Sequence, residues 1–150
     1  MAKLTSEWIE SLPTFKELKQ RGRFSAPDSW IEPGIRKLCK SLNKLPYVVT
    51  VGSCEGHTRE EYIERGWDMD ETPAHIQLYV LADRRFELWD WIKENIGMDK
   101  VEITLDPMFE PGSEMSKFIY RDENPTYVRD KLFNVQITSK SLRMPFKGDR

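Results

Sequence analysis

The sequence predicts a single α+β domain over residues 1–150, with a mixed or mainly antiparallel five-stranded sheet and helices packed on one face. Apolar residues recur at helical spacing in three segments and alternate with polar residues in others. Only the crossover from Leu81 to Val101 carries a main helix from one strand to the next, whereas a dinucleotide-binding fold repeats such units. The tail, from about residue 144 to 150, is expected to fray.

Two helices are expected before the first strand. The first covers residues 5–20, is capped by Ser6 and can be split by Pro13, because an interior proline removes a backbone hydrogen bond. The second begins at Pro33, a residue favoured in the first turn, and ends before Pro46. Its apolar face consists of Ile35, Leu38, Cys39 and Leu42.

Strands and one long helix account for the rest of the chain. β-Branched or alternating residues predict strands at 47–53 and 75–81. Asp83 is expected to cap a helix from Arg84 to Ile96, which Gly97 ends. The apolar face of this helix consists of Phe86, Leu88, Trp89, Ile92 and Ile96. Three further strands are expected, at 101–105, 117–121 and 132–138.

Composition and charge exclude several classes of protein. A mean hydropathy of −0.62 and the lack of a long apolar run exclude a membrane-spanning helix. The N-terminus has no apolar signal region, so a cytoplasmic location is expected. The net charge of −2 argues against a dedicated nucleic-acid binder without excluding one. Neither a cofactor nor an oligomeric state is assigned by the sequence.

The segment between the first two expected strands, residues 50–73, is the candidate functional loop. The first strand delivers Ser53 and Cys54 to its end, and Gly56 permits a tight turn. Thr58-Arg59-Glu60-Glu61 matches a capping box, which predicts a short helix from Thr58. Free N–H groups at that helix start are expected to lower the pKa of Cys54 and to favour a small anionic ligand.

Site residues follow from this loop. Cys54 and His57 are the catalytic candidates, as thiolate and as acid or base. The ligand-binding candidates are Ser53, Gly56, Thr58 and His75. The alternative is a structural turn in which Cys54 is only a small buried hydrophobic residue. Trp67 either covers the site or inserts into the core, and Cys39 is expected to be core.

Two other chemistries fit the loop less well. Cys54, His57 and His75 can converge on a metal if the first two strands are antiparallel neighbours. One Cys-x-x-His is only half of a zinc signature, so no metal site is expected. Cysteine phosphatases use Cys-x5-Arg, whereas four residues separate Cys54 from Arg59 here.

Ser53-Cys54-Glu55-Gly56-His57 resembles the loop of the tRNA wybutosine-synthesising methyltransferases of the TYW3 type, which reads Ser-Ser-Cys-Ser-Gly-Arg. The matching residues are Ser53, Cys54 and Gly56, and the resemblance implies S-adenosylmethionine and a tRNA guanine derivative as substrate. The turn is more similar to small uncharacterised bacterial and phage proteins with Ser-Cys-x-Gly-His after a Leu-Pro helix end. That second resemblance implies no activity.

Three functions therefore compete. The first is a small intracellular protein with a ligand or anion site on the 53–57 loop. The second is a tRNA-modifying methyltransferase, for which one basic helix face offers phosphate contacts. That face consists of Arg36, Lys37, Lys40 and Lys44. The third is a non-enzymatic interaction module that uses Trp30, Trp67 or Trp91 in a contact patch.

Overall fold

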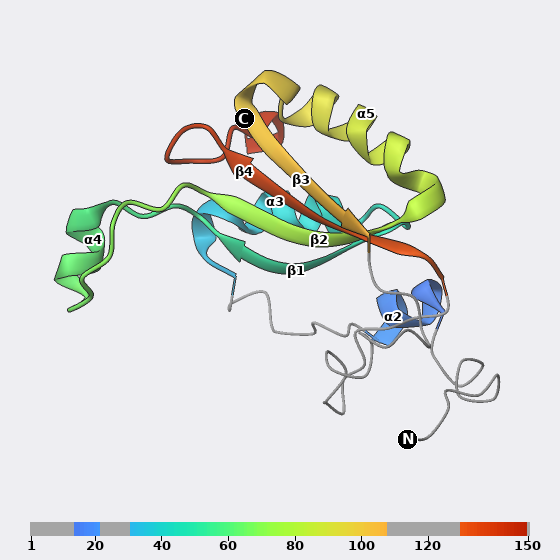
Figure 1. Cartoon of the computed structure of the whole chain (residues 1–150), viewed down its shortest axis with the longest axis horizontal. Coiled ribbons are helices and arrows are strands. Elements are labelled where there is room, and N and C mark those ends of the chain that lie inside the picture. The colour runs from blue at the N-terminus through green and yellow to red at the C-terminus, as the bar shows by residue number, and fades with distance from the viewer. Residues whose placement is uncertain (1–13, 22–30, 108–129, 150) are drawn as a thin grey trace.

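The computed structural model describes residues 14–21, 31–107 and 130–149 (Figure 1). Four antiparallel strands form one sheet in the order β1-β2-β4-β3, so the α+β class with an antiparallel sheet is confirmed. The strands are β1 (Val48–Cys54), β2 (His75–Leu81), β3 (Val101–Pro107) and β4 (Leu132–Ser139). The strand expected at 117–121 and the helix start expected at 5–13 lie outside the described residues.

The main core lies between the sheet and two helices, α3 (Pro33–Asn43) and α5 (Arg85–Asn95). Pro33 starts α3 as predicted, and the four expected apolar residues of that helix are buried. They pack on strand residues such as Val48, Ile76 and Leu78, which are fully buried. Among the described residues, no helix has the length and apolar character needed to cross a membrane.

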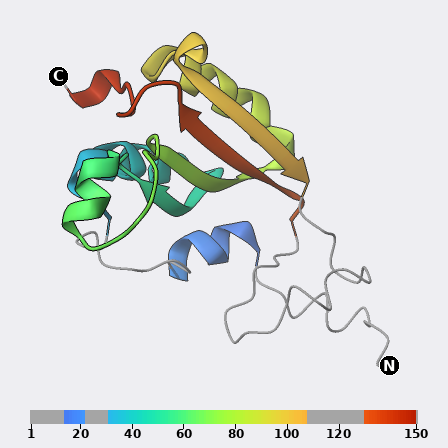
Figure 2. The same ribbon diagram turned by 60° about the vertical axis from the view of Figure 1, so that its left-hand side comes forward.

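Helix α2 (Phe15–Arg21) corrects the expectation that all helices share one face of the sheet. Phe15 packs with Val49, Tyr79 and Leu132 in a separate cluster. Side chains alternate along a strand, so Val49 points away from the face that buries Val48. Figure 2 shows α2 on the side of the sheet away from α3 and α5.

Two other expectations about the second half of the chain were wrong. Phe86 is 61% exposed, because the buried residues of α5 and its end are Leu88, Ile92 and Ile96, spaced by four, and Phe86 falls off that stripe. A 3₁₀ turn precedes α5, so the residue at its N-cap is Arg84 and not Asp83.

The end of the described chain is packed and not frayed. Met144 and Phe146 lie against the main core, and the ring of Phe146 lies 6.2 Å from that of Trp91. A 3₁₀ turn, η4 (Lys147–Asp149), follows them. The apolar surface that these side chains bury explains why the segment does not fray.

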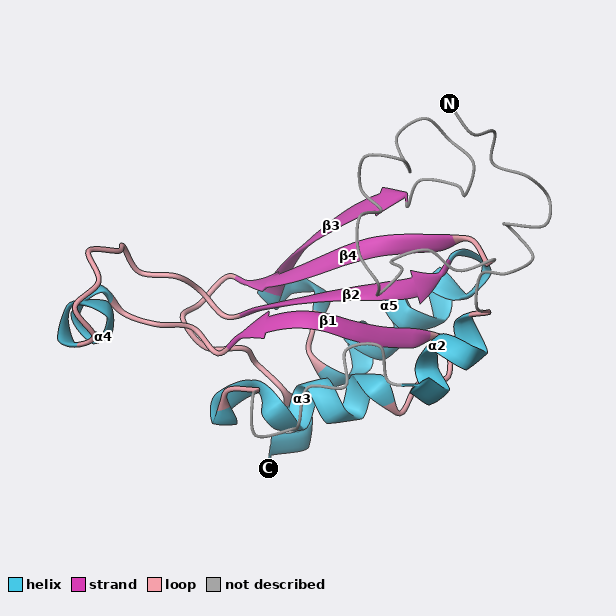
Figure 3. Cartoon of the chain, turned by 90° about the horizontal axis from the view of Figure 1, so that it is seen from below, coloured by secondary structure: helices cyan, strands magenta, loops and turns pink. Residues whose placement is uncertain are grey.

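The chain between β1 and β2 projects beyond the sheet as an arm, here defined as residues 55–74 (Figures 1 and 3). A single antiparallel bridge between His57 and Thr72 continues the β1–β2 ladder into the arm. Helix α4 (Arg59–Glu64) lies in the outer part of the arm. Residues 55–57 therefore form the base of the arm, and Glu55 contacts the N-terminal end of α3 there.

Candidate functional site

His57 is the buried centre of the site, with an exposed fraction of 4%. Its Nε2 lies 2.6 Å from Glu32 Oε2, and its Nδ1 lies 3.1 Å from Glu61 Oε2. A carboxylate oxygen only accepts hydrogen bonds, so with both carboxylates ionised each ring nitrogen must carry a hydrogen. The arrangement therefore places the imidazole ring between two acidic side chains.

The capped helix predicted at Thr58 explains the position of Glu61, one of these two partners. Thr58 is the N-cap of α4, and its hydroxyl accepts a hydrogen bond of 3.1 Å from the backbone N–H of Glu61. In a capping box the acidic side chain would return to the cap backbone, but Glu61 bonds His57 instead. His57 and the nearby Arg143 both lower the pKa of Glu61, the hydrogen bond from His57 being the larger cause.

Gly56 is required where the chain turns into the arm. Its φ is +92°, and a Cβ atom there would lie 2.0 Å from the carbonyl oxygen of Leu142. That oxygen accepts the backbone N–H of Ala74 at 2.9 Å. Next along the chain, Arg143 donates to the carbonyls of Glu55 and Gly56 and reaches Glu61 Oε1 at 3.3 Å. Residues 142–143 therefore close the base of the arm from the opposite side.

The backbone N–H groups of residues 55–57 are already bonded within the chain. The N–H of Glu55 donates to Glu32 at 3.0 Å, and that of His57 donates to Thr72 at 2.9 Å. The N–H of Gly56 points to the Cys54 sulfur at 3.4 Å. With the Glu32, Glu55 and Glu61 carboxylates around them, these groups favour positive over negative charge.

The lowered pKa expected of Cys54 is wrong, because the structure raises the pKa of this thiol. Burial is the main cause, the negative charges of Glu32 and Glu55 add to it, and the N–H of Gly56 opposes it. Helix α4 has only six residues and its first N–H groups are partly capped, so its dipole does not outweigh burial.

Cys39 is core, as predicted, with an exposed fraction of 1%. Burial raises the pKa of its thiol, and a hydrogen bond with Ser53 opposes that shift. The Ser53 side chain thus lies against Cys39 on α3. It does not join the site around His57.

The structure brings together a donor set that only partly matches the expected one. Ligand atoms of Glu32, Cys54 and His57 all lie within 4.8 Å of one another. His75 is paired with Cys54 across the strands, but its Nδ1 lies 3.1 Å from the Pro73 carbonyl and it is not part of this cluster. The sequence shows Glu61 at helical spacing from His57, but it carries no local signal for Glu32.

The outer arm carries an aromatic stack. Tyr62 lies edge-on to His57, with ring centroids 5.4 Å apart, and Trp67 stacks on Tyr62 at 6.1 Å. Trp67 is 53% exposed, so it neither covers the His57 site directly nor inserts into the core. Ile63 and Met69 are also exposed on the arm.

Comparison of the chain with protein-family models, with curated proteins and with solved structures finds no match.

Proposed function

We propose that this protein binds a small ligand at the turn from Ser53 to His57, and that the ligand presents positive charge to the turn. The observation that carries the proposal is the buried His57 with a carboxylate on each ring nitrogen, at 2.6 and 3.1 Å. The partners of His57 are side chains and not backbone groups. Side chains can rotate, so one of these carboxylates can turn from His57 toward a cationic ligand.

The carboxylate charges of the site and the bonded state of its backbone N–H groups favour a cationic ligand. The sequence had led us to expect an oxyanion. Glu32, Glu55 and Glu61 contribute carboxylates, and Arg143 is bonded to Glu61 and to backbone carbonyls. An incoming anion would meet these carboxylates without free N–H donors from residues 55–57.

Binding fits the site better than thiol catalysis does. A nucleophilic cysteine needs a lowered pKa or a base that takes its proton. The pKa of Cys54 is raised by burial, and both nitrogens of His57 already face carboxylates. Methyl transfer to tRNA remains a hypothesis from the resemblance alone.

An NMR titration tests this proposal. Methylammonium, guanidinium and zinc ions should shift the amide signals of residues 53–57, whereas phosphate and acetate should not. Glu32→Gln keeps an acceptor but removes a charge, so it should weaken the response about tenfold. Glu102→Gln, on the distant edge strand β3, is the control and should leave it unchanged. A response to phosphate or acetate that exceeds the response to every cation would refute the proposal.

An interaction module is a second candidate, supported by the exposed apolar side chains of the outer arm. Ile63, Trp67 and Met69 are 54%, 53% and 46% exposed. Acidic residues outnumber basic ones in this segment, so a partner with a basic surface fits it. A basic amphipathic peptide should then shift amide signals of residues 59–71 in the native protein, and Trp67→Ala should abolish the shift. Equal shifts in Trp67→Ala would exclude this role.

A further inference from the structure

We propose that Glu32, Cys54 and His57 form a binding site for one divalent cation of the zinc class. The inference rests on the proposed function and names its ligand. It reverses the expectation of no metal, because Glu32 supplies a donor that the sequence did not reveal. The three residues come from the start of α3, the end of β1 and the base of the arm, so folding is what brings them together.

The donor types select the class of metal. The set offers a carboxylate oxygen, a cysteine sulfur and an imidazole nitrogen. Calcium and magnesium take oxygen ligands, whereas zinc and its neighbours accept sulfur, nitrogen and oxygen together. Three protein ligands leave one tetrahedral position for water or an incoming ligand, as in zinc sites with catalytic or exchange roles.

The distances require small side-chain movements. Bonds of about 2.0–2.3 Å around a tetrahedral zinc ion separate its ligand atoms by about 3.3–3.6 Å. Glu32 Oε2 must therefore retreat slightly from its 2.6 Å contact with His57 Nε2, and all three ligand atoms already lie within 4.8 Å of one another. The Glu32 side chain is 30% exposed and has room to rotate. Binding releases the Cys54 thiol proton, together with any hydrogen on His57 Nε2, to solvent, with no redox change.

An outer layer of hydrogen bonds already orients His57 for this role. Glu61 binds Nδ1 at 3.1 Å, which fixes the hydrogen on that nitrogen and leaves Nε2 to the metal. Arg143 in turn holds Glu61 at 3.3 Å and the Glu55 carbonyl at 3.1 Å. Carboxylates in this second position orient zinc-binding histidines and raise their basicity. This chain of contacts uses neither Glu32 nor Cys54, and it points to the same function.

The two cysteines and two histidines of the chain provide matched controls for the test. Cobalt(II) is the probe, because a thiolate ligand gives it a charge-transfer absorption band. The native protein should show that band with one cobalt per chain, and zinc should remove it. Cys54→Ser should abolish the band and His57→Ala should weaken binding about a hundredfold or more. Cys39→Ala and His75→Ala should bind as the native protein does.

A second measurement on the native protein avoids any effect of a variant on folding. Zinc should shift the ring signals of His57 and leave those of His75 in place. Cobalt binding without a thiolate band, a band lost in Cys39→Ala but kept in Cys54→Ser, or zinc shifts confined to His75 would overturn the metal site.

The two proposals can fail separately. If methylammonium shifts residues 53–57 but zinc and cobalt do not bind, the metal site is wrong and the cation-selective turn stands. If neither organic cations nor metals bind, both proposals fall.

Discussion

The two ends of the β1–β2 ladder each hold a partly or fully buried basic side chain, and they use it in opposite ways. At the arm, His57 is bonded to the side chains of Glu32 and Glu61. At the other end, Lys19 of α2 donates its Nζ hydrogens to the backbone carbonyls of Asn43, Leu45 and Val48. Backbone carbonyls cannot rotate away, so Lys19 has a structural role, whereas the carboxylates beside His57 can turn toward a ligand.

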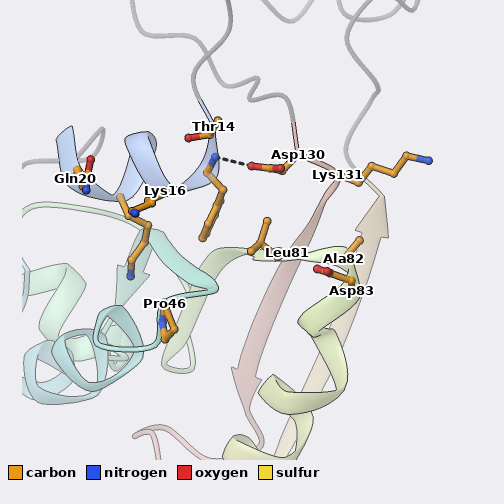
Figure 4. A pocket seen from close by; sticks show the side chains of 11 residues that line it. Thr14, Lys16, Gln20, Pro46, Leu81, Ala82, Asp83, Asp130 and Lys131 are labelled. Carbon is orange, nitrogen blue, oxygen red and sulfur yellow. Dashed lines mark hydrogen bonds between the residues drawn. The ribbon is translucent and has the colours of Figure 1, made fainter. Parts of the chain in front are cut away.

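A cavity at the Lys19 end also distinguishes the two ends of the ladder. A space of about 610 Å³ lies beside Lys19, lined among others by Phe15, Leu81 and Asp130 (Figure 4). Its charged groups are of both signs, and Asp130 is bonded to the backbone N–H of Phe15 at 2.7 Å. This cavity and the site with converging donor side chains lie at opposite ends of the strands. A cavity therefore does not by itself identify the candidate binding site.

The largest expected effect is the loss of stability when a side chain is added at Gly56. Gly56→Ala places a Cβ atom against the Leu142 carbonyl at 2.0 Å in a left-handed conformation, and should cost about 3 kcal/mol or more in the free energy of unfolding. Gly66 has a similar φ of +81° but nothing within 4 Å, so Gly66→Ala should cost only about 1–2 kcal/mol. Urea unfolding measures both. Equal losses would mean that the base of the arm is not closed by residues 142–143.

The structural role of Lys19 predicts the next largest effect. Lys19→Met removes the donor of three hydrogen bonds and should cost about 2 kcal/mol of stability. Lys16→Met, on the same helix but exposed, should change stability by less than about 0.5 kcal/mol. Neither variant should alter ligand binding at the arm. A loss of cobalt affinity in Lys19→Met would show that the two ends are not independent.

The features that were predicted correctly are those determined by residues close together in the sequence. Helix α3 and strand β2 were predicted almost to the residue, because periodicity and Pro33 are visible over a few positions. The capped helix at Thr58 was predicted for the same reason. The approach of Glu32 and Arg143 to the arm was not predictable, because it depends on tertiary packing between distant segments.

Glu61→Gln should show whether Glu61 orients His57 for metal binding without contributing much to the stability of the fold. The amide keeps a hydrogen-bond acceptor for His57 but loses the charge that Arg143 and His57 share. Metal affinity should fall about tenfold to a hundredfold, as for other outer-layer carboxylates, while stability changes by less than about 1 kcal/mol. Glu60→Gln, one residue earlier and exposed, is the matched control. Cobalt titration and urea unfolding of both variants give the comparison. Unchanged affinity in Glu61→Gln would remove Glu61 from the site.

The smallest expected effect is a difference in thiol reactivity between the two cysteines. Burial raises the pKa of both thiols, and in addition the Glu32 and Glu55 carboxylates disfavour the thiolate of Cys54. Cys54 is half-buried, so iodoacetamide should label it slowly. The pH at which its labelling rate stops rising should be higher in the native protein than in the unfolded chain. Cys39 should stay unlabelled until the protein unfolds, because it is 1% exposed.

Glu32→Gln tests the electrostatic part of that prediction. The variant removes one of the negative charges that raise the pKa of Cys54, so its labelling profile should move to lower pH. The variant Glu102→Gln, on the edge strand β3 and separated from Cys54 by strands β2 and β4, should leave the profile in place. The shift should be modest, because burial, the larger cause, is unchanged. If Cys54 is labelled at a lower pH in the native protein than in the unfolded chain, the fold stabilises its thiolate. That result would support a nucleophilic role for Cys54.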